Sequence, residues 1–255
     1  QFANSFYTSL SGPSQWLDDT SDNAVSNSPK DWLFNNAIVP GSGGEWATSN
    51  WANIRNLNYF LGRYQTVEGD EGEINQYVGE IRFFRAHEYF NKVKMFGDVP
   101  WIDKDLTTAD TELLMKARDP RSFVIDKIIE DLTFAANNMK KPADLEKGRL
   151  NRYAALQLLA RVALYEGTWM KYRNISGWET YLQKAVEASS TIMNEGNYAI
   201  VKGNAPFKFE GFPLYYRQQF IQEDLSTNAE CVLARIYQKD LLMHGLSRSV
   251  NETGW

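Results

Sequence analysis

The segment between residues 74 and 100 constrains the fold most, because it reads as one helix that is apolar on two faces. Both stripes repeat at helical spacing, with Phe83, Ala86, Phe90 and Val93 on one and Tyr77, Ile81 and Phe84 on the other. Gly97 supplies a helix stop, and Pro100 prevents the helix from continuing. A helix with two apolar faces must pack between other elements, so the pattern predicts a helical core around it.

Further periodic segments predict paired helices. Their expected ranges are 45–65, 74–96, 120–139, 151–166 and 177–194. Two apolar seams support antiparallel packing and consist of Ile125, Ile129, Leu132, Ala136 and Met139, and of Tyr181, Ala185, Ala188 and Ile192. We expect Asp119 to cap a helix that begins at Pro120, and residues 176–179 to form a capping box. The prediction is a mainly α fold of tetratricopeptide-like helical hairpins.

The two ends of the chain have a different character. Residues 1–50 are rich in polar residues and glycine, with one early helix at about 4–10. Beyond residue 196, short extended segments are predicted at 198–201 and 231–237, with an aromatic loop at 207–220 between them. Cys231, the single cysteine, should lie buried in the second segment. We therefore expect irregular loops and a few short strands beside the helices.

Charge and composition exclude several classes of function. The net charge is −5 and the pI about 5.2, without a basic run, so nucleic acid is not an expected partner. No apolar run approaches the roughly 20 residues that span a bilayer. The single cysteine excludes an intramolecular disulfide. The composition suits a globular protein that handles neutral or weakly charged ligands.

Signatures of catalysis and cofactor binding are sparse. His87 and His244 do not share a metal-ligand spacing with Cys231, and we expect His87 to be structural. No nucleophile elbow, phosphate loop or dinucleotide fingerprint occurs, so neither a metal nor a cofactor is predicted. Acidic loop residues leave a glycoside hydrolase as an alternative, which would need two carboxylates at a fixed separation; they are Asp18, Asp19, Glu68, Asp70, Glu71 and Glu73.

Tryptophan is concentrated in the polar N-terminal region. Four of the eight tryptophans lie within the first 51 residues, namely Trp16, Trp32, Trp46 and Trp51. A tryptophan among Ser, Asn and Gly either anchors its loop or faces a ligand, and both interpretations remain open for Trp32 and Trp46. A sugar ring needs flat aromatic platforms beside amide, carboxylate or guanidinium groups. Trp51 precedes apolar helix positions and is expected to be structural.

Five segments, in order, resemble the SusD/RagB family of Bacteroidetes surface glycan-binding proteins. The most specific runs from an Arg-Phe-Phe-Arg-Ala core to Phe-Gly-Asp-Val-Pro at residues 82–100. The others are residues 51–61, 123–132, 148–162 and 228–233. The resemblance implies a SusD-like α fold in a single region, 1–255, which we expect to be the N-terminal part of a longer protein. Within it we distinguish an irregular aromatic region at 1–50, a helical-repeat core at 45–195, and loops with short strands at 196–255.

The resemblance also implies a function. It is non-catalytic binding of oligosaccharide or polysaccharide at the cell surface, with delivery to a SusC-like, TonB-dependent outer-membrane transporter. The protein would be a surface lipoprotein of the outer membrane, attached only through an N-terminal lipid anchor that is absent from this chain. The expected ligand-binding residues are Trp46 and Asn50, then Trp32 and Asp31, and a second cluster of Tyr215, Tyr216 and Arg217.

Two other functions compete with this one. A helical-repeat module could bind a peptide or protein on its concave face without any role in sugar binding. A glycoside hydrolase would cleave its ligand, and turnover would distinguish it from the other two. Loss of ligand binding after substitution of Trp46 favours glycan capture over the interaction module.

Overall fold

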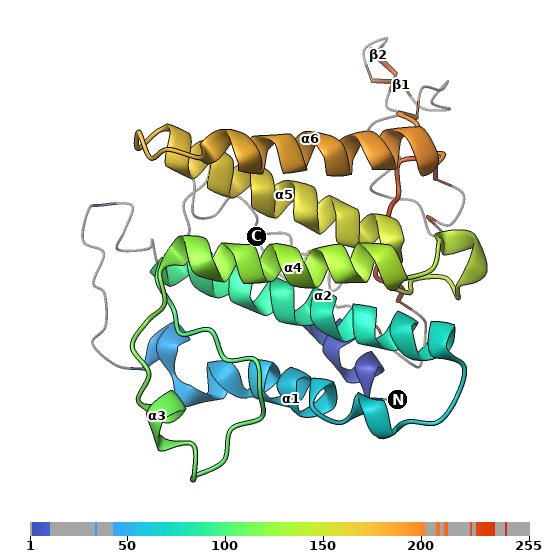
Figure 1. Ribbon diagram of the computed structural model, residues 1–255. Helices are drawn as coiled ribbons and strands as arrows, with labels where there is room; N and C mark the ends of the chain where they lie inside the picture. The colour runs from blue at the N-terminus through green and yellow to red at the C-terminus, as the bar shows by residue number, and fades with distance from the viewer. Residues whose placement is uncertain are drawn as a thin grey trace, which may run out of the picture. The chain divides into compact units, whose positions relative to one another are not determined.

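The computed structural model describes residues 2–10, 34, 43–201, 208–209, 212–213, 225, 228–237 and 243. The chain divides into two compact units. One comprises Gln1–Ala52 with Arg235–Trp255, and the other comprises Asn53–Ala234 (Figure 1). Within the described residues, the first unit holds the short 3-10 helices Ala3–Ser9, Gly44–Trp46 and Thr48–Trp51. The second unit holds almost all of the α-helical structure.

The second unit is an array of helices with one small hairpin. Its elements are α1 (Ala52–Leu61), α2 (Glu71–Phe96), α3 (Thr111–Leu114), α4 (Arg121–Asn138), α5 (Arg152–Lys171), α6 (Trp178–Glu195), β1 (Lys208–Phe209) and β2 (Phe212–Pro213). Short 3-10 turns lie at Tyr64–Thr66 and Pro142–Asp144. The two strands pair antiparallel, with Phe209 opposite Phe212. The mainly α architecture confirms the predicted fold class.

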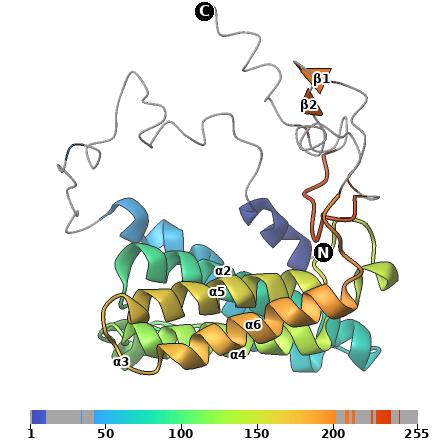
Figure 2. The ribbon, with the colours of Figure 1, turned by 90° about the horizontal axis from the view of Figure 1, so that it is seen from above.

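Four helices make two layers. α4 packs against both α2 and α5, and α5 packs against α6. Figure 2 shows α2 and α5 in one layer and α4 and α6 in the other. Both predicted seams are buried in this array, since Ile125 and Leu132 are inaccessible to solvent and Tyr181 and Ile192 are less than 10% exposed. These antiparallel hairpins are the predicted tetratricopeptide-like arrangement.

The double-faced helix lies where its sequence requires. α2 runs between α4 and α1 in Figure 1, and both of its predicted stripes are buried apart from Tyr77. Tyr77 is 38% exposed, and the guanidinium of Arg149 lies 4.8 Å from its ring centroid. Gly97 ends the helix with φ 70°, and its N–H donates to the Val93 carbonyl. The predicted stop is therefore confirmed.

Two predicted helix starts are wrong in detail. Pro120, not Asp119, occupies the cap position of α4, and no side chain caps it. The Asp119 carboxylate instead accepts from the Trp101 N–H at 2.7 Å and pairs with Lys116. At α6 the cap is Gly177 in the left-handed conformation, again without a capping side chain, so the predicted box does not form. The glycine turns the chain into the helix by backbone geometry alone.

The predicted extended segments are also wrong. Residues 198–201 and 231–237 carry no regular strand, and Ala229 lies in a turn. The Ala199 N–H donates to the Ala229 carbonyl, so the two segments meet without a ladder. Cys231 is only half-buried. The observed strands fall inside the predicted aromatic loop, where Phe209 pairs with Phe212.

Candidate functional site

The described part of the N-terminal unit holds an aromatic pair. Trp46 and Trp51 lie 5.2 Å apart between ring centroids, with an interplanar angle of 78°. Both side chains are half-buried. An edge-to-face contact of this kind occupies one face of only one of the two rings. The contact therefore anchors the two tryptophans to each other and leaves other ring faces uncovered by it.

Asn50 lies in the same loop as Trp46 and helps to close it. Its amide nitrogen donates to the Gly44 carbonyl at 3.0 Å and reaches the Glu45 carboxylate at 3.5 Å. Its amide oxygen has no hydrogen-bond partner within the described residues. A carbonyl oxygen fixed in this way can accept from a hydroxyl of a ligand. The structure thus places the two predicted residues, Trp46 and Asn50, in consecutive 3-10 turns.

The other predicted binding residues lie outside the described part of the chain. They are Asp31, Trp32, Tyr215, Tyr216 and Arg217. Their roles stay predictions. The neighbouring strands β1 and β2 mark the place of the second cluster in the sequence.

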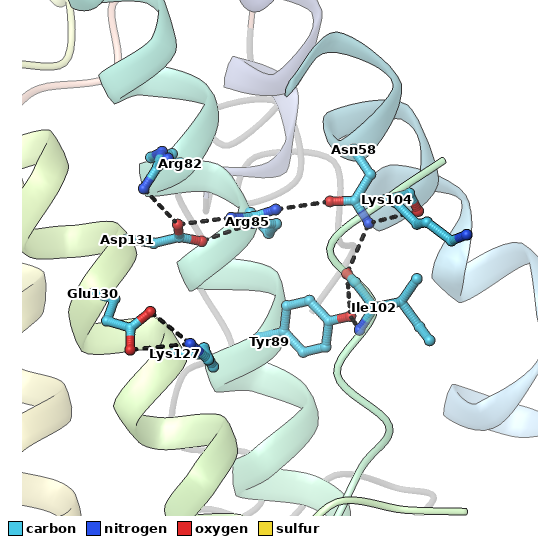
Figure 3. A network of polar contacts seen from close by, with 9 residues as sticks. All are labelled: Asn58, Arg82, Arg85, Tyr89, Ile102, Lys104, Lys127, Glu130 and Asp131. Atoms are coloured by element: carbon cyan, nitrogen blue, oxygen red, sulfur yellow. Dashed lines mark hydrogen bonds and ion pairs between the residues drawn. The ribbon is translucent and has the colours of Figure 1, made fainter. Parts of the chain in front are cut away.

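Polar side chains at the centre of the helical unit form a network of hydrogen bonds and ion pairs (Figure 3). Arg85 on α2 donates from Nε and Nη2 to the two carboxylate oxygens of Asp131 on α4, each at 2.7 Å. Its Nη1 donates to the side-chain oxygen of Asn58 on α1 at 3.0 Å. Asn58 in turn donates to the carbonyl of Ile102 at 2.8 Å. One guanidinium therefore ties three segments together, and the hydrogen bonds of Asn58 assign it a structural role.

Tyr89 extends this network. Its hydroxyl donates to the Ile102 carbonyl at 3.0 Å and accepts from the Ile102 N–H at 2.8 Å. Burial raises the pKa of Tyr89 well above its ordinary value. The ring of Trp101 lies 4.3 Å away, and Arg85 lies 5.1 Å from the Trp101 centroid. These contacts hold the segment that follows Pro100 against α2.

A second buried ion pair lies at the start of α4. Arg121 donates from Nε to the Glu166 carboxylate on α5 at 2.7 Å, and both side chains are buried. Its guanidinium lies 4.1 Å from the ring of Trp169, and Arg173 lies 4.4 Å from the same ring. The carboxylate of Glu166 is thus part of a buried structural ion pair.

Two of the described candidates for the hydrolase alternative, Asp70 and Glu73, have structural partners. Asp70 caps α2 by accepting from the Glu73 N–H at 2.9 Å, and Glu73 pairs with Lys140. Asp18 and Asp19 lie outside the described residues. Across the described ranges, no group of three or more His, Cys, Asp or Glu side chains could hold a metal ion. No helix in that part of the chain is long and apolar enough to cross a membrane.

The family follows from comparison with known proteins. A family model described as "Starch-binding associating with outer membrane" matches residues 7–164. The chain belongs to the SusD-like family. The match spans α1, α2, α4 and most of α5, which are the helices that the polar networks join.

Individual relatives agree with this assignment. SusD-like protein P2 of Formosa agariphila is 25% identical over 212 residues, which cover 76% of this chain and 39% of the relative. The crystal structure of a SusD-like protein from Bacteroides fragilis matches with a TM-score of 0.64 and 26% identity, over 80% of this chain and 39% of that one. A SusD superfamily protein from Parabacteroides distasonis gives a TM-score of 0.56 and 26% identity, over 67% and 36%. This chain thus spans about two fifths of the length of these relatives.

Sequence reasoning missed the polar core. The ion pairs join residues 45 or 46 positions apart, such as Arg85 with Asp131, and no local spacing indicates them. The available signal was the presence of charged residues inside otherwise apolar stripes of α2, α4 and α5. A charge at such a position requires a buried partner.

Proposed function

We propose that this protein captures oligosaccharide without cleaving it, at the bacterial cell surface, and passes it to a TonB-dependent, SusC-like outer-membrane transporter. In this proposal it belongs to a surface lipoprotein of the outer membrane and needs neither metal nor cofactor. The observation that carries the proposal is the pairing of Trp46 with Trp51 beside Asn50, in a chain of the SusD-like family. The description of the matching family, starch binding with outer-membrane association, supports the same function.

The loop offers the two chemical elements that a sugar requires. Trp46 supplies an aromatic ring for the C–H face of a pyranose, and the amide oxygen of Asn50 supplies an acceptor for a hydroxyl. The hydrogen bond from Asn50 to Gly44 orients that oxygen before ligand arrives, which lowers the entropic cost of binding. Trp32 with Asp31, and the cluster of Tyr215, Tyr216 and Arg217, are proposed to extend the site.

Calorimetry with a panel of neutral oligosaccharides tests this proposal. We expect micromolar-to-millimolar binding without cleavage, and at least about tenfold weaker binding in Trp46→Ala. Tyr172→Ala is the matched control, because Tyr172 is an aromatic residue of the helical unit that is 81% exposed. Equal affinity in both variants would remove Trp46 from the site. Cleavage of any ligand would establish the hydrolase alternative instead.

The transporter contact is proposed for one end of the helical array. Exposed apolar side chains occur where α2 ends, α3 lies, α4 begins and α5 ends, and they are Met95, Leu114, Met115, Phe123, Tyr172 and Ile175. Figure 1 shows these helix ends on the same side of the array. Met115 and Tyr172 are more than 80% exposed, which is unusual for large apolar residues. The same observation favours the helical-repeat interaction module as a second candidate.

The charge-introducing variants Met115→Asp and Tyr172→Asp separate docking on the transporter from glycan binding. If the array docks on a transporter, the variants should lose association with a SusC-like protein while glycan affinity stays unchanged. Met193→Asp on α6 is the control, because Met193 is 69% exposed but lies near the other end of the array. Undiminished association in all three variants would exclude this end as the docking surface.

A further inference from the structure

The α2–α5 seam carries three basic side chains that form no ion pair with any residue that the structure describes. We define it by His87, Asn91 and Lys94 on α2 and by Arg161 and Leu164 on α5. The three α2 positions are spaced i, i+4 and i+7, so they lie on one helix face. Lys94 and Arg161 are exposed, and Leu164 is 53% exposed. No ion pair of His87, Lys94 or Arg161 occurs within the described ranges.

The packing of the two helices fixes this seam. Phe90 on α2 meets Tyr165 on α5 edge to face, with ring centroids 5.4 Å apart. Phe90 is about one turn from His87 and from Lys94, and Tyr165 is about one turn from Arg161. Figure 2 shows α2 and α5 in the same layer. The ring contact therefore holds the three basic side chains in a common region on rigid elements.

The seam holds like positive charges beside one acidic group, the Glu88 carboxylate. Burial lowers the pKa of His87, and Lys94 and Arg161 lower it further, while only Glu88 opposes them. Burial and the charge of Arg161 also lower the pKa of Lys94. The Glu88 carboxylate is engaged by the Asn53 amide at 2.8 Å. The basic groups thus act on one another as like charges.

A buried atom without a partner points to the same place. Nδ1 of His87 is buried and has no hydrogen-bond partner within the described part of the chain. Leaving a buried polar atom unpaired typically costs about 1–3 kcal/mol. A ligand that accepts a hydrogen bond and carries negative charge would satisfy this atom and offset the repulsion between Lys94 and Arg161.

We propose that the α2–α5 seam binds an oxyanion, either a sulfate or a carboxylate group, through His87, Lys94 and Arg161. Guanidinium and ammonium groups form charge-assisted hydrogen bonds with such groups, and an imidazolium adds a third donor. The amide of Asn91 lies on the same face and can donate to the same group. This site is separate from the proposed sugar loop and does not depend on the proposed function.

Histidine NMR titrations of this 255-residue chain test the proposal. The chain has two histidines, so His244→Gln leaves His87 as a single reporter. Sodium sulfate or sodium acetate is added at constant ionic strength, with sodium chloride as the balance. Bound oxyanion favours the imidazolium, so the pKa of His87 should rise. By linkage, binding should weaken as pH increases through that pKa.

Matched variants exclude a general charge effect. Arg161→Gln should weaken oxyanion binding about tenfold and abolish most of the rise in the pKa of His87. Lys184→Gln removes one positive charge from α6, outside the seam. It should leave the oxyanion affinity and the rise in the pKa of His87 unchanged. Circular dichroism establishes that the variants are folded. If only sulfate raises the pKa of His87, the ligand of the site is a tetrahedral dianion. If only acetate raises it, the ligand is a carboxylate. An unchanged pKa with both salts, or an equal rise in Arg161→Gln, would overturn the proposal.

Discussion

Arg85 and Asp131 form a two-point ion pair between α2 and α4, with both nitrogen–oxygen distances at 2.7 Å. Their side chains are 7% and 3% exposed, so the pair is shielded from water. Arg82 adds a third, longer contact to Asp131 at 3.5 Å. The arrangement fixes the rotation of α2 relative to α4, because the planar guanidinium and the carboxylate must be coplanar to make both bonds.

Removing one partner of this pair should be strongly destabilising. Asp131→Ala leaves the Arg85 guanidinium buried without its counter-charge, so we expect the free energy of unfolding to fall by about 3–5 kcal/mol in urea titrations. Glu130→Ala is the control on the same helix, since Glu130 pairs with Lys127 at the surface, and it should cost less than about 1 kcal/mol. Equal losses in the two variants would contradict the assigned role of the buried pair.

Gly167→Ala should destabilise the contact of α5 with α6. A Cβ atom at this position would lie 2.6 Å from Leu182 Cδ2, 2.8 Å from Leu182 Cγ and 3.1 Å from the Trp178 carbonyl oxygen. The overpacking typically costs about 1–3 kcal/mol, which exceeds the roughly 1 kcal/mol gained from helix propensity. Gly62→Ala meets only ordinary contacts and should be neutral within about 0.5 kcal/mol. Thermal unfolding of the two variants measures the difference.

Asn151 has two separable roles at the start of α5. Its side-chain oxygen accepts from the Tyr153 and Ala154 N–H groups, and its amide nitrogen donates to the Val232 carbonyl at 3.2 Å. Asn151→Ala loses the cap and the bond to Val232. We expect it to lower the free energy of unfolding in urea by about 1–2 kcal/mol. Asn151→Asp keeps the cap and loses only the second bond, so its cost should be smaller. An aspartate variant less stable than the alanine variant would contradict this assignment, because alanine loses the cap as well as the bond to Val232.

Asp110 should stay ionised at unusually low pH. The hydrogen bond from Lys104, and then those from Thr107, lower its pKa to about 2. Because the folded-state pKa is lowered, the stabilisation is fully present above the ordinary value of 3.8 and is lost as pH falls through about 2. Carboxyl NMR titration measures the midpoint, and Lys104→Gln should shift it upward. A midpoint near 3.8 in the unaltered protein would refute the loop geometry.

The helix positions were largely legible in the sequence. Apolar periodicity placed α2, α4 and α6 to within about three residues, because their buried faces repeat every three or four positions. α5 runs five residues beyond its predicted end, to Lys171. The expected helix from residue 45 begins only at Ala52, after two short 3-10 turns. Such turns leave no periodic pattern of their own.

What the sequence by itself determined is the set of amphipathic helices and the glycine stop at Gly97, since both depend on local spacing and backbone freedom. Only the tertiary structure decided the partners of the polar groups. Asp119 was available as a cap, yet its carboxylate binds Trp101 and Lys116. Asn50 closes its own turn, and Arg85 finds Asp131 across the core. A polar side chain takes the partner that folding brings within hydrogen-bond distance, and that distance is a property of the packed chain.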